Sequence, residues 1–395
     1  MQVFHEQLNT AVLGEYDIIV AGGGVAARRA GIKRVLLLEK GILFGGLATQ
    51  GLISLYEPIC DGKGHKIIYG MGAELMKLCM RYGPDVLPEQ WRDDPDTASP
   101  DGGKYKTFFS PAMFAMALDE FVLDAGVEIL FDTQVVAPVM EQKQCVGLLV
   151  ENKRGRGLYR ARAVIDATGD ADIFCRAGAP CVTGQNYMTY LAYRADMESA
   201  ASALSEKNII HARKWTLLGS GPRGNGHPEG VPLISGTTAE DVTQYVLTGR
   251  KMMLDSMRNE DRFARDLSIL PTMAQFRTTR HIVGAYSVQE SDLCRRLPDS
   301  IAAVADFLTA GEWYEIPYRA LYSPEYPNLW TAGRTVSADG WAWVVVRVIP
   351  GSACSGQAAG LAAALCLKHG FTAATLPYSM LSDALVAEGG RMHAE

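Results

Sequence analysis

Small residues and one acid near the N-terminus have the spacing of a nucleotide-binding site. Gly22, Gly24 and Ala27 fit the pattern G-x-G-x-x-G/A, in which missing side chains let the backbone turn tightly and approach a pyrophosphate. A helix that starts there offers N–H groups and its positive dipole end to the anion. Glu39 closes the next apolar run, where a carboxylate can accept hydrogen bonds from ribose hydroxyls. This pattern favours dinucleotide binding over the alternative, a glycine-rich turn in an ordinary α/β core.

A second group of chemically capable residues lies in the segment FRTTRHIVG. It contains Arg277, Arg280 and His281. An arginine can hold a substrate carboxylate by paired hydrogen bonds, and a histidine can transfer a proton near neutral pH. On a strand, Arg277 and His281 would share one face. Structural salt bridges explain the same residues equally well, so a catalytic role is one of two alternatives.

The elements that must position the glycines are unusually short. Asp17–Ala21 and Val35–Leu38 have the continuous apolar character of buried strands, and Gly22–Lys33 connects them. A complete crossover between parallel strands needs about 10–12 residues, so this segment is just long enough. It leaves room for a helix of about seven residues, roughly half the usual length. We expect the phosphate-binding geometry to be retained, with poorer helix packing and weaker binding.

Apolar patterning predicts the remaining elements in two groups. The first group comprises a helix at Pro111–Ala125, a strand at Val127–Phe131, two or three antiparallel strands after it and a core strand at Ala163–Asp166. The second comprises a strand near 189–197, a helix at Ala239–Arg258 and a strand at Gln275–Tyr286. An alanine-rich helix is expected at Gly356–Lys368. The order predicts an α/β fold with an antiparallel β-ribbon inserted in a parallel sheet, plus a smaller α+β domain.

Composition argues against several classes of function. The 395 residues carry a net charge of -6, so no basic surface for nucleic acid or anionic lipid is indicated. The eight cysteines form no CxxC pair and no cluster with histidine at zinc spacing, so we expect no metal site and reduced, cytoplasmic thiols. The N-terminus lacks the features of a secretory signal. One long uncharged run, Val348–Leu367, contains a proline, a glutamine and several glycines, which disfavours a membrane span.

Four segments in order resemble the FAD-dependent oxidoreductases of the glutathione-reductase-like flavoprotein superfamily. They are the glycine segment above, EKGILFGGLAT after the second strand, VIDATGDAD at 164–172, and NLWTAGRTVS with VRVIPGSACSGQAAG within 328–360. The resemblance covers nearly the whole chain. It implies a Rossmann-like FAD-binding domain formed by residues 1-185 and 326-395, with a substrate domain at 186-325 between them.

The resemblance also assigns roles to matching positions. A helix starting at Gly356 would direct its N–H groups at the flavin ring. Arg347 and the segment LYEPICDGKGH would lie near the substrate, and Cys60 in that segment is expected to be a buried, unreactive thiol. The residues that would contact FAD are Gly22, Gly24, Ala27, Glu39, Lys40, Gly45, Gly46, Thr49, Gln134 or Val135, Thr168, Gly169, Asp170, Gly333, Arg334, Gly356, Gln357 and Ala358.

These features predict an FAD-dependent oxidoreductase that acts on a small organic substrate by hydride transfer, with an unidentified electron donor or acceptor. Members of the family typically carry about seven more residues in the first crossover, close to two helical turns. The alternative is therefore a degenerate flavin-fold protein with weakened cofactor binding. An NAD-dependent dehydrogenase is a further alternative, disfavoured by the ribbon before DATGD and by the returning C-terminal segment. The sequence predicts no oligomeric state.

Overall fold

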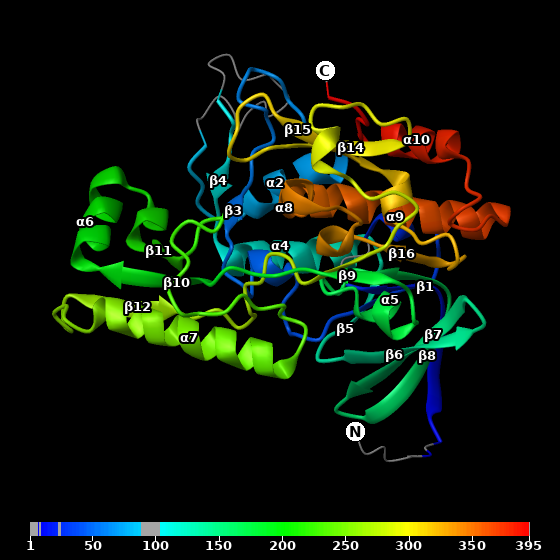
Figure 1. The fold of residues 1–395 in the computed structure, drawn as a ribbon, viewed down its shortest axis with the longest axis horizontal. Coiled ribbons are helices and arrows are strands. Elements are labelled where there is room, and N and C mark those ends of the chain that lie inside the picture. The colour runs from blue at the N-terminus through cyan, green and yellow to red at the C-terminus, as the bar shows by residue number, and fades with distance from the viewer. Residues whose placement is uncertain (1–6, 8, 23–24, 88–102, 395) are drawn as a thin grey trace.

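The fold is seen in a computed structural model that describes residues 7, 9–22, 25–87 and 103–394 (Figure 1). Its main sheet has seven strands in the order β5-β2-β1-β8-β7-β6, and β16 pairs with β8. The strands are β1 (Ala11–Ala21), β2 (Val35–Leu38), β5 (Glu128–Leu130), β6 (Gln134–Glu141), β7 (Gln144–Asn152), β8 (Gly155–Asp166) and β16 (Leu329–Thr331). The predicted class, an α/β fold with a parallel sheet and an inserted antiparallel ribbon, is confirmed.

The ribbon and the parallel core share one strand. β8 pairs antiparallel with β7 through its first half and parallel with β1 along its length. The predicted core strand Ala163–Asp166 is therefore the end of β8, the third ribbon strand. There β16 pairs with β8 on the side opposite to β1. β1 is also longer than predicted, because Ala11–Tyr16 pairs with the ribbon part of β8 before the buried segment begins.

In the described part of the first crossover the one helix is α1 (Val25–Arg29), which is shorter than the predicted helix of about seven residues. β1 and β2 nevertheless pair in parallel from Ile18 to Ala21. Arg28 ties down the end of the connection, because its guanidinium donates to the carbonyl oxygens of Ile32 at 3.0 Å and Gly126 at 3.1 Å. Side-chain hydrogen bonds thus replace part of the packing that a longer helix would supply.

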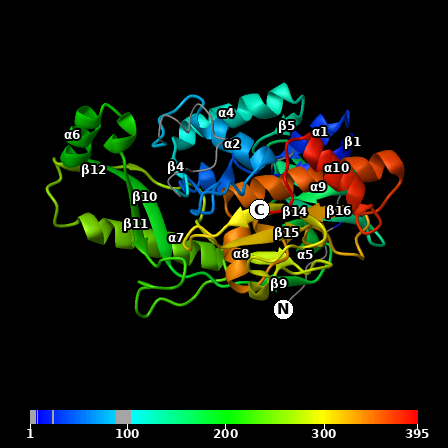
Figure 2. The same ribbon diagram turned by 90° about the horizontal axis from the view of Figure 1, so that it is seen from above.

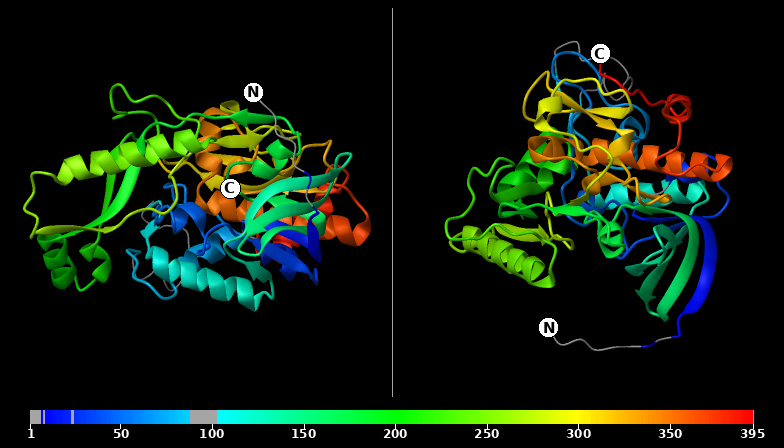
Figure 3. Two further views of the ribbon diagram at one scale, coloured as in Figure 1. Left: turned by 90° about the horizontal axis from the view of Figure 1, so that it is seen from below. Right: turned by 45° about the vertical axis from the view of Figure 1, so that its right-hand side comes forward.

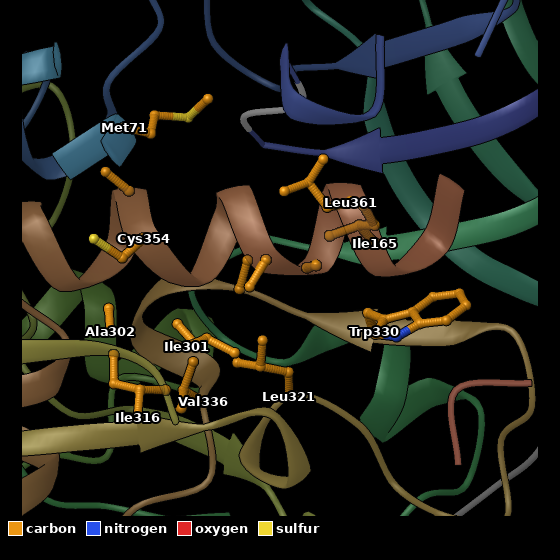
Figure 4. Close-up of a cluster of buried hydrophobic side chains, with 14 of the residues drawn as sticks. Met71, Ile165, Ile301, Ala302, Ile316, Leu321, Trp330, Val336, Cys354 and Leu361 are labelled. Carbon is orange, nitrogen blue, oxygen red and sulfur yellow. The ribbon is translucent and has the colours of Figure 1, made fainter. Parts of the chain in front are cut away.

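The long helix α9 (Ile349–His369) runs through the centre of the main core (Figure 4). It packs against α1, α2 (Gly70–Met80), α10 (Tyr378–Ala387) and the strands β8 and β16. Small residues allow this approach: a Cβ atom at Gly72 of α2 would lie 2.9 Å from the Cys354 sulfur. The predicted helix start at Gly356 was wrong. The helix begins seven residues earlier, with Pro350 in its first turn, where proline is tolerated.

A second unit projects to one side of the main sheet (Figure 2). Its antiparallel sheet has the order β11-β10-β12 and is covered by α7, with α6 beside it. Tyr190, Tyr245 and Phe276 form the centre of its separate core. The bounds are β10 (Thr189–Asp196), α6 (Met197–Glu206), β11 (Lys214–Gly219), α7 (Ala239–Met257) and β12 (Arg265–Ile269). The predicted strand near 189–197 and helix at Ala239–Arg258 are confirmed.

The predicted strand Gln275–Tyr286 was wrong over most of its length. Only β13 (Arg280–Ile282) is extended and paired, with β9 (Cys181–Thr183). Before it, the backbone N–H groups of Arg277 and Thr278 donate to the side-chain oxygen of Asn186, at 2.7 and 2.9 Å. These donors are satisfied by a side chain, so the segment needs no neighbouring strand.

The hairpin of β14 (Ser300–Ala305) and β15 (Trp313–Pro317) belongs by packing to the main core, as Figure 3 also suggests. Ile301 and Ile316 are buried in the same cluster as Leu361 of α9 (Figure 4). The domain limits 1-185, 186-325 and 326-395 stay a proposal, and this packing favours an earlier end for the second unit. The other elements are β3 (Leu55–Tyr56), β4 (Thr107–Phe108), α4 (Pro111–Asp124), α5 (Asp172–Arg176) and α8 (Gly340–Val346).

No single helix of the described residues is both long and apolar enough to cross a bilayer. The helices α8 and α9 meet that criterion only as a pair bent by 81°. Most of α9, which contains the uncharged run except its first residue, Val348, is buried in the core.

Asp166, at the end of β8, gives a test of the strand-end packing. Its fully buried carboxylate accepts hydrogen bonds from the N–H groups of Ile173 at 2.9 Å and Phe174 at 3.1 Å, and from the Thr168 hydroxyl at 2.7 Å. Asp166→Ala should lower the free energy of unfolding in urea by about 3 kcal/mol, because these donors lose their acceptor. Asp166→Asn, which keeps one oxygen, should lose less.

The exposed Asp383 on α10 is the control for this measurement. Asp383→Ala should change the free energy of unfolding by less than about 0.5 kcal/mol. Equal losses for Asp166→Ala and Asp383→Ala would contradict the assigned role of Asp166.

Candidate active site

A cavity of about 380 Å³ lies at the carboxyl ends of the parallel strands. Residues at or just after the ends of β1, β2, β8 and β16 line it, and so does the N-terminal part of α9. Ligands of open parallel sheets bind at this edge. The predicted site residues in its wall are Gly22, Glu39, Lys40, Gly45, Gly46, Gln134, Val135, Thr168, Gly169, Gly333, Arg334, Arg347 and Gly356.

Gly22 is required where β1 meets the cavity. Its φ is +108°, and a Cβ atom there would lie 2.4 Å from the Ala167 carbonyl oxygen. Any side chain would therefore push β1 and the end of β8 apart. Gly24, the second glycine of the motif, lies outside the described residues. Gly46, further along, is open toward the cavity: the nearest atom to its added Cβ would be the Met273 sulfur at 4.0 Å.

Glu39 follows β2 and faces the cavity next to Lys40. One carboxylate oxygen accepts a hydrogen bond from the Gly41 N–H at 2.7 Å, which fixes the side chain. Burial raises the pKa of Glu39, while the Gly41 hydrogen bond and the charge of Lys40 act in the opposite direction. Gln50 also donates a side-chain hydrogen bond to Glu39, and a ligand with hydroxyl groups would add further donors.

Arg334, just after β16, is buried and held by several partners. It pairs with Asp170 at 2.7 Å and donates to the carbonyl oxygens of Gly169 at 2.6 Å and Phe276 at 2.8 Å. Burial alone would raise the pKa of Asp170, but the charge of Arg334 and hydrogen bonds from Arg334 and Thr279 hold it below its ordinary value. Arg334 thus joins the ends of β8 and β16 to the second unit.

The side of α9 that faces the cavity has little bulk. Apart from the helix's own backbone, no atom of the described residues would lie within 4 Å of a Cβ atom at Gly356, so this position is open to the cavity. Gln357 lies elsewhere, because its side-chain oxygen accepts from the Met71 N–H at 3.0 Å, at the start of α2. The residues predicted to contact the cofactor that lie outside the cavity wall are Ala27, Thr49, Asp170, Gln357 and Ala358.

The predicted group Arg277, Arg280 and His281 is not assembled in the cavity wall. Arg280 pairs with Asp172 at 2.6 Å, and Arg277 donates to the carbonyl oxygens of Ser220 and Gly221. His281 is buried against the Trp343 ring, and burial lowers its pKa. Of the two alternatives from the sequence, these contacts favour the structural one for Arg280. A catalytic role for the group stays a prediction.

Arg347, between α8 and α9, does face the cavity. Its Nε is buried and has no hydrogen-bond partner within the described part of the chain. Burial and the neighbouring positive charges of Arg277 and Arg334 lower its pKa to about 9, and the negative charge of Glu57 opposes them. An anion that enters the cavity would offset the cost of burying this guanidinium, so anion binding beside Arg347 is favourable.

The sequence reading overlooked Glu57, which follows β3 and lines the same cavity. Its Oε2 is buried and has no hydrogen-bond partner among the described residues. Burial raises its pKa to about 7, although Arg347 and nearby backbone amides act to lower it. The signal that the sequence offers for it is a lone acid between apolar residues in LYEPIC. Cys60 is fully buried, as predicted.

A sequence model described as FAD dependent oxidoreductase matches residues 17–197 and 215–385 of the chain. No curated protein matches the sequence significantly.

Three solved structures illustrate the structural likeness. CabE, an aromatic hydroxylase from angucycline biosynthesis, has 14% identity and a TM-score of 0.45, over 94% of this chain and 65% of CabE. The p-nitrophenol 4-monooxygenase PnpA from Pseudomonas putida DLL-E4 has 13% identity and a TM-score of 0.46, over 95% and 85%. A geranylgeranyl bacteriochlorophyll reductase-like protein from Thermoplasma acidophilum has 13% identity and a TM-score of 0.43, over 95% of this chain and 83% of that protein. None of them identifies a substrate for this chain.

The open face of Gly356 provides a test of where FAD lies. Gly356→Val should fold at least as stably as the natural chain, because glycine is unfavourable inside a helix and nothing lies within 4 Å. The added side chain would enter the cavity, so FAD affinity should fall by roughly tenfold or more. The measurements are thermal unfolding of the apoprotein and FAD titration followed by visible absorbance.

Gly356→Ala adds a single methyl group and should weaken FAD binding less than the valine variant. Unchanged FAD affinity in Gly356→Val would place the cofactor away from α9.

Proposed function

Because the chain belongs to the FAD dependent oxidoreductase family, we propose that it oxidises or reduces a small organic anion by hydride transfer. FAD is its cofactor. The cavity fits that group, since it extends along the strand ends from Gly22 to Gly356 and the open glycines Gly46 and Gly356 leave room for a ligand. When bound, FAD supplies the acceptor or donor of the hydride.

Several roles in holding FAD follow from the family resemblance and are proposed here. Gly22 and the loop at Gly45 and Gly46 lie along the pyrophosphate and its linker, where bulky side chains would interfere. Glu39 accepts hydrogen bonds from the ribose. The N-terminal turns of α9 provide backbone N–H groups toward the flavin.

The observation that carries the proposed substrate class is the environment of Arg347. Its guanidinium faces the cavity, has a buried and unpartnered Nε, and is flanked by the charges of Arg277 and Arg334. Arginine binds carboxylates through paired, charge-assisted hydrogen bonds. We therefore assign Arg347 to binding the anionic group of the substrate, which orients the reacting carbon beside the flavin.

No disulfide joins any of the eight cysteines, all of which lie in the described part of the chain, and this supports the proposed cytoplasmic setting. A separate electron donor or acceptor would return the flavin to its starting oxidation state after each turnover.

The first test is the visible spectrum of the purified protein and its response to small organic acids. Flavin bands bleached by dithionite are expected, and under anaerobic conditions a substrate acid should bleach them, whereas its uncharged amide should not. Arg347→Met should retain FAD. The rate at which the acid bleaches the flavin should fall about 100-fold, because an anionic substrate loses its counter-charge.

Arg258→Met is the matched control, since Arg258 at the end of α7 is exposed and pairs only with Asp255. It should behave as the natural chain. A colourless, folded protein that ignores added FAD would instead support the degenerate alternative. Equal bleaching by acids and amides would refute the assignment of Arg347.

A further inference from the structure

Two ionisable side chains in the cavity wall, Glu57 and Arg347, lie close enough to affect each other's pKa but do not form an ion pair. Glu57 comes from the loop after β3, and Arg347 comes from the junction of α8 and α9. Each influences the other's proton affinity, yet no ion pair or hydrogen bond joins them among the described contacts. Within the part of the chain that the structure describes, the buried atoms Glu57 Oε2 and Arg347 Nε have no hydrogen-bond partner. The two side chains therefore leave hydrogen-bonding capacity for a third group.

Buried polar atoms without partners are rare and costly, at about 1–3 kcal/mol each. Two of them in the wall of one cavity point to a ligand that satisfies both. Arg347 can only donate, so the ligand atom beside it is an acceptor. An anion beside Arg347 would repel an ionised Glu57, whereas a protonated Glu57 would donate a hydrogen bond to it.

We propose that Glu57 and Arg347 together bind the carboxylate of the substrate, with Glu57 in its neutral, proton-donating form. This inference rests on the proposed function, because it specifies how that function's anionic substrate is held. The apolar residues of the same cavity wall, among them Met71, Leu75 and Phe114, suit a ligand with a hydrocarbon body behind its carboxylate.

Among the ionisable groups around this site, Glu57 is the one expected to change its protonation state near neutral pH. Arg347 is the charged group that acts on it. The adjacent Tyr56 and the cysteines near it, Cys79 and Cys354, have pKa values raised by burial and stay neutral there. The other charged residues that line the cavity are Arg334, Glu39, Lys40 and Asp172. Burial raises the pKa of Glu57 to about 7, so its neutral form is available at physiological pH.

The sign of the pH dependence follows from this linkage. If only the neutral form of Glu57 binds a carboxylate, affinity is greatest below the pKa and is lost as the pH rises through it. With a pKa of about 7, the dissociation constant of hexanoate should increase about tenfold between about pH 6 and pH 8. Hexanoate stays ionised throughout, and 1-hexanol is the uncharged probe whose binding should not change with pH.

The experiment is isothermal titration calorimetry of hexanoate into the FAD-loaded protein. Glu57→Gln should bind hexanoate with the same affinity at both pH values, because the amide donates a hydrogen bond and does not titrate. Arg347→Met should lose most of the binding at either pH. Glu240→Gln, the same change at an exposed position of α7, should keep the tenfold dependence.

Two results would overturn the proposal: a pH-independent dissociation constant in the natural chain, or a tenfold dependence that survives in Glu57→Gln. Loss of FAD from Arg347→Met would also overturn it, since Arg347 would then hold the cofactor rather than the substrate. Calorimetry detects hexanoate whether or not hydride transfer occurs. A pH-dependent hexanoate site without bleaching by any acid would therefore refute hydride transfer while keeping the binding site.

Discussion

The close approach of α9 to its neighbours is the constraint on which the rest of the structure depends. This helix contacts α1, α2, α10 and the strands β8 and β16, and its glycines and alanines set how near they come. A methyl group added at Gly351 would lie 2.1 Å from the Val346 carbonyl oxygen. Because this packing holds the N-terminal turns of α9 beside the strand ends, a five-residue α1 is sufficient to complete the crossover.

Buried strands were predictable from the sequence because a parallel strand covered on both faces is a continuous apolar run. β1 and β2 followed from that pattern, whereas the antiparallel ribbon followed from apolar runs separated by polar turns. The start of α9 was not predictable in this way. Val348 provides no side-chain cap, and Pro350 suggests a helix break when tertiary packing is unknown. The segment after Gln275 has strand-like residues, but Asn186 takes its backbone donors, a contact that no local pattern signals.

The site was predictable to the extent that backbone shape decides it. Gly22, Gly45, Gly46, Gly169 and Gly333 all adopt positive φ and all lie in the cavity wall. Side-chain roles were harder to predict, because they depend on which partners the fold supplies. Arg280 pairs with Asp172, whereas the described residues supply no hydrogen-bond partner for the Nε of Arg347. Glu57 has no spacing that distinguishes it, and only its burial and its missing partner mark it.

Arg334 has a further consequence for motion. One guanidinium nitrogen donates to Phe276, a residue of the second unit's core, while others contact Gly169 and Asp170 at the sheet edge. Rotation of the second unit away from the sheet at this point would strip an acceptor from a buried cation, at a cost of about 1.5–3 kcal/mol. Rotation of the second unit about this point is therefore disfavoured by roughly 10- to 150-fold relative to motions that keep the hydrogen bonds of Arg334.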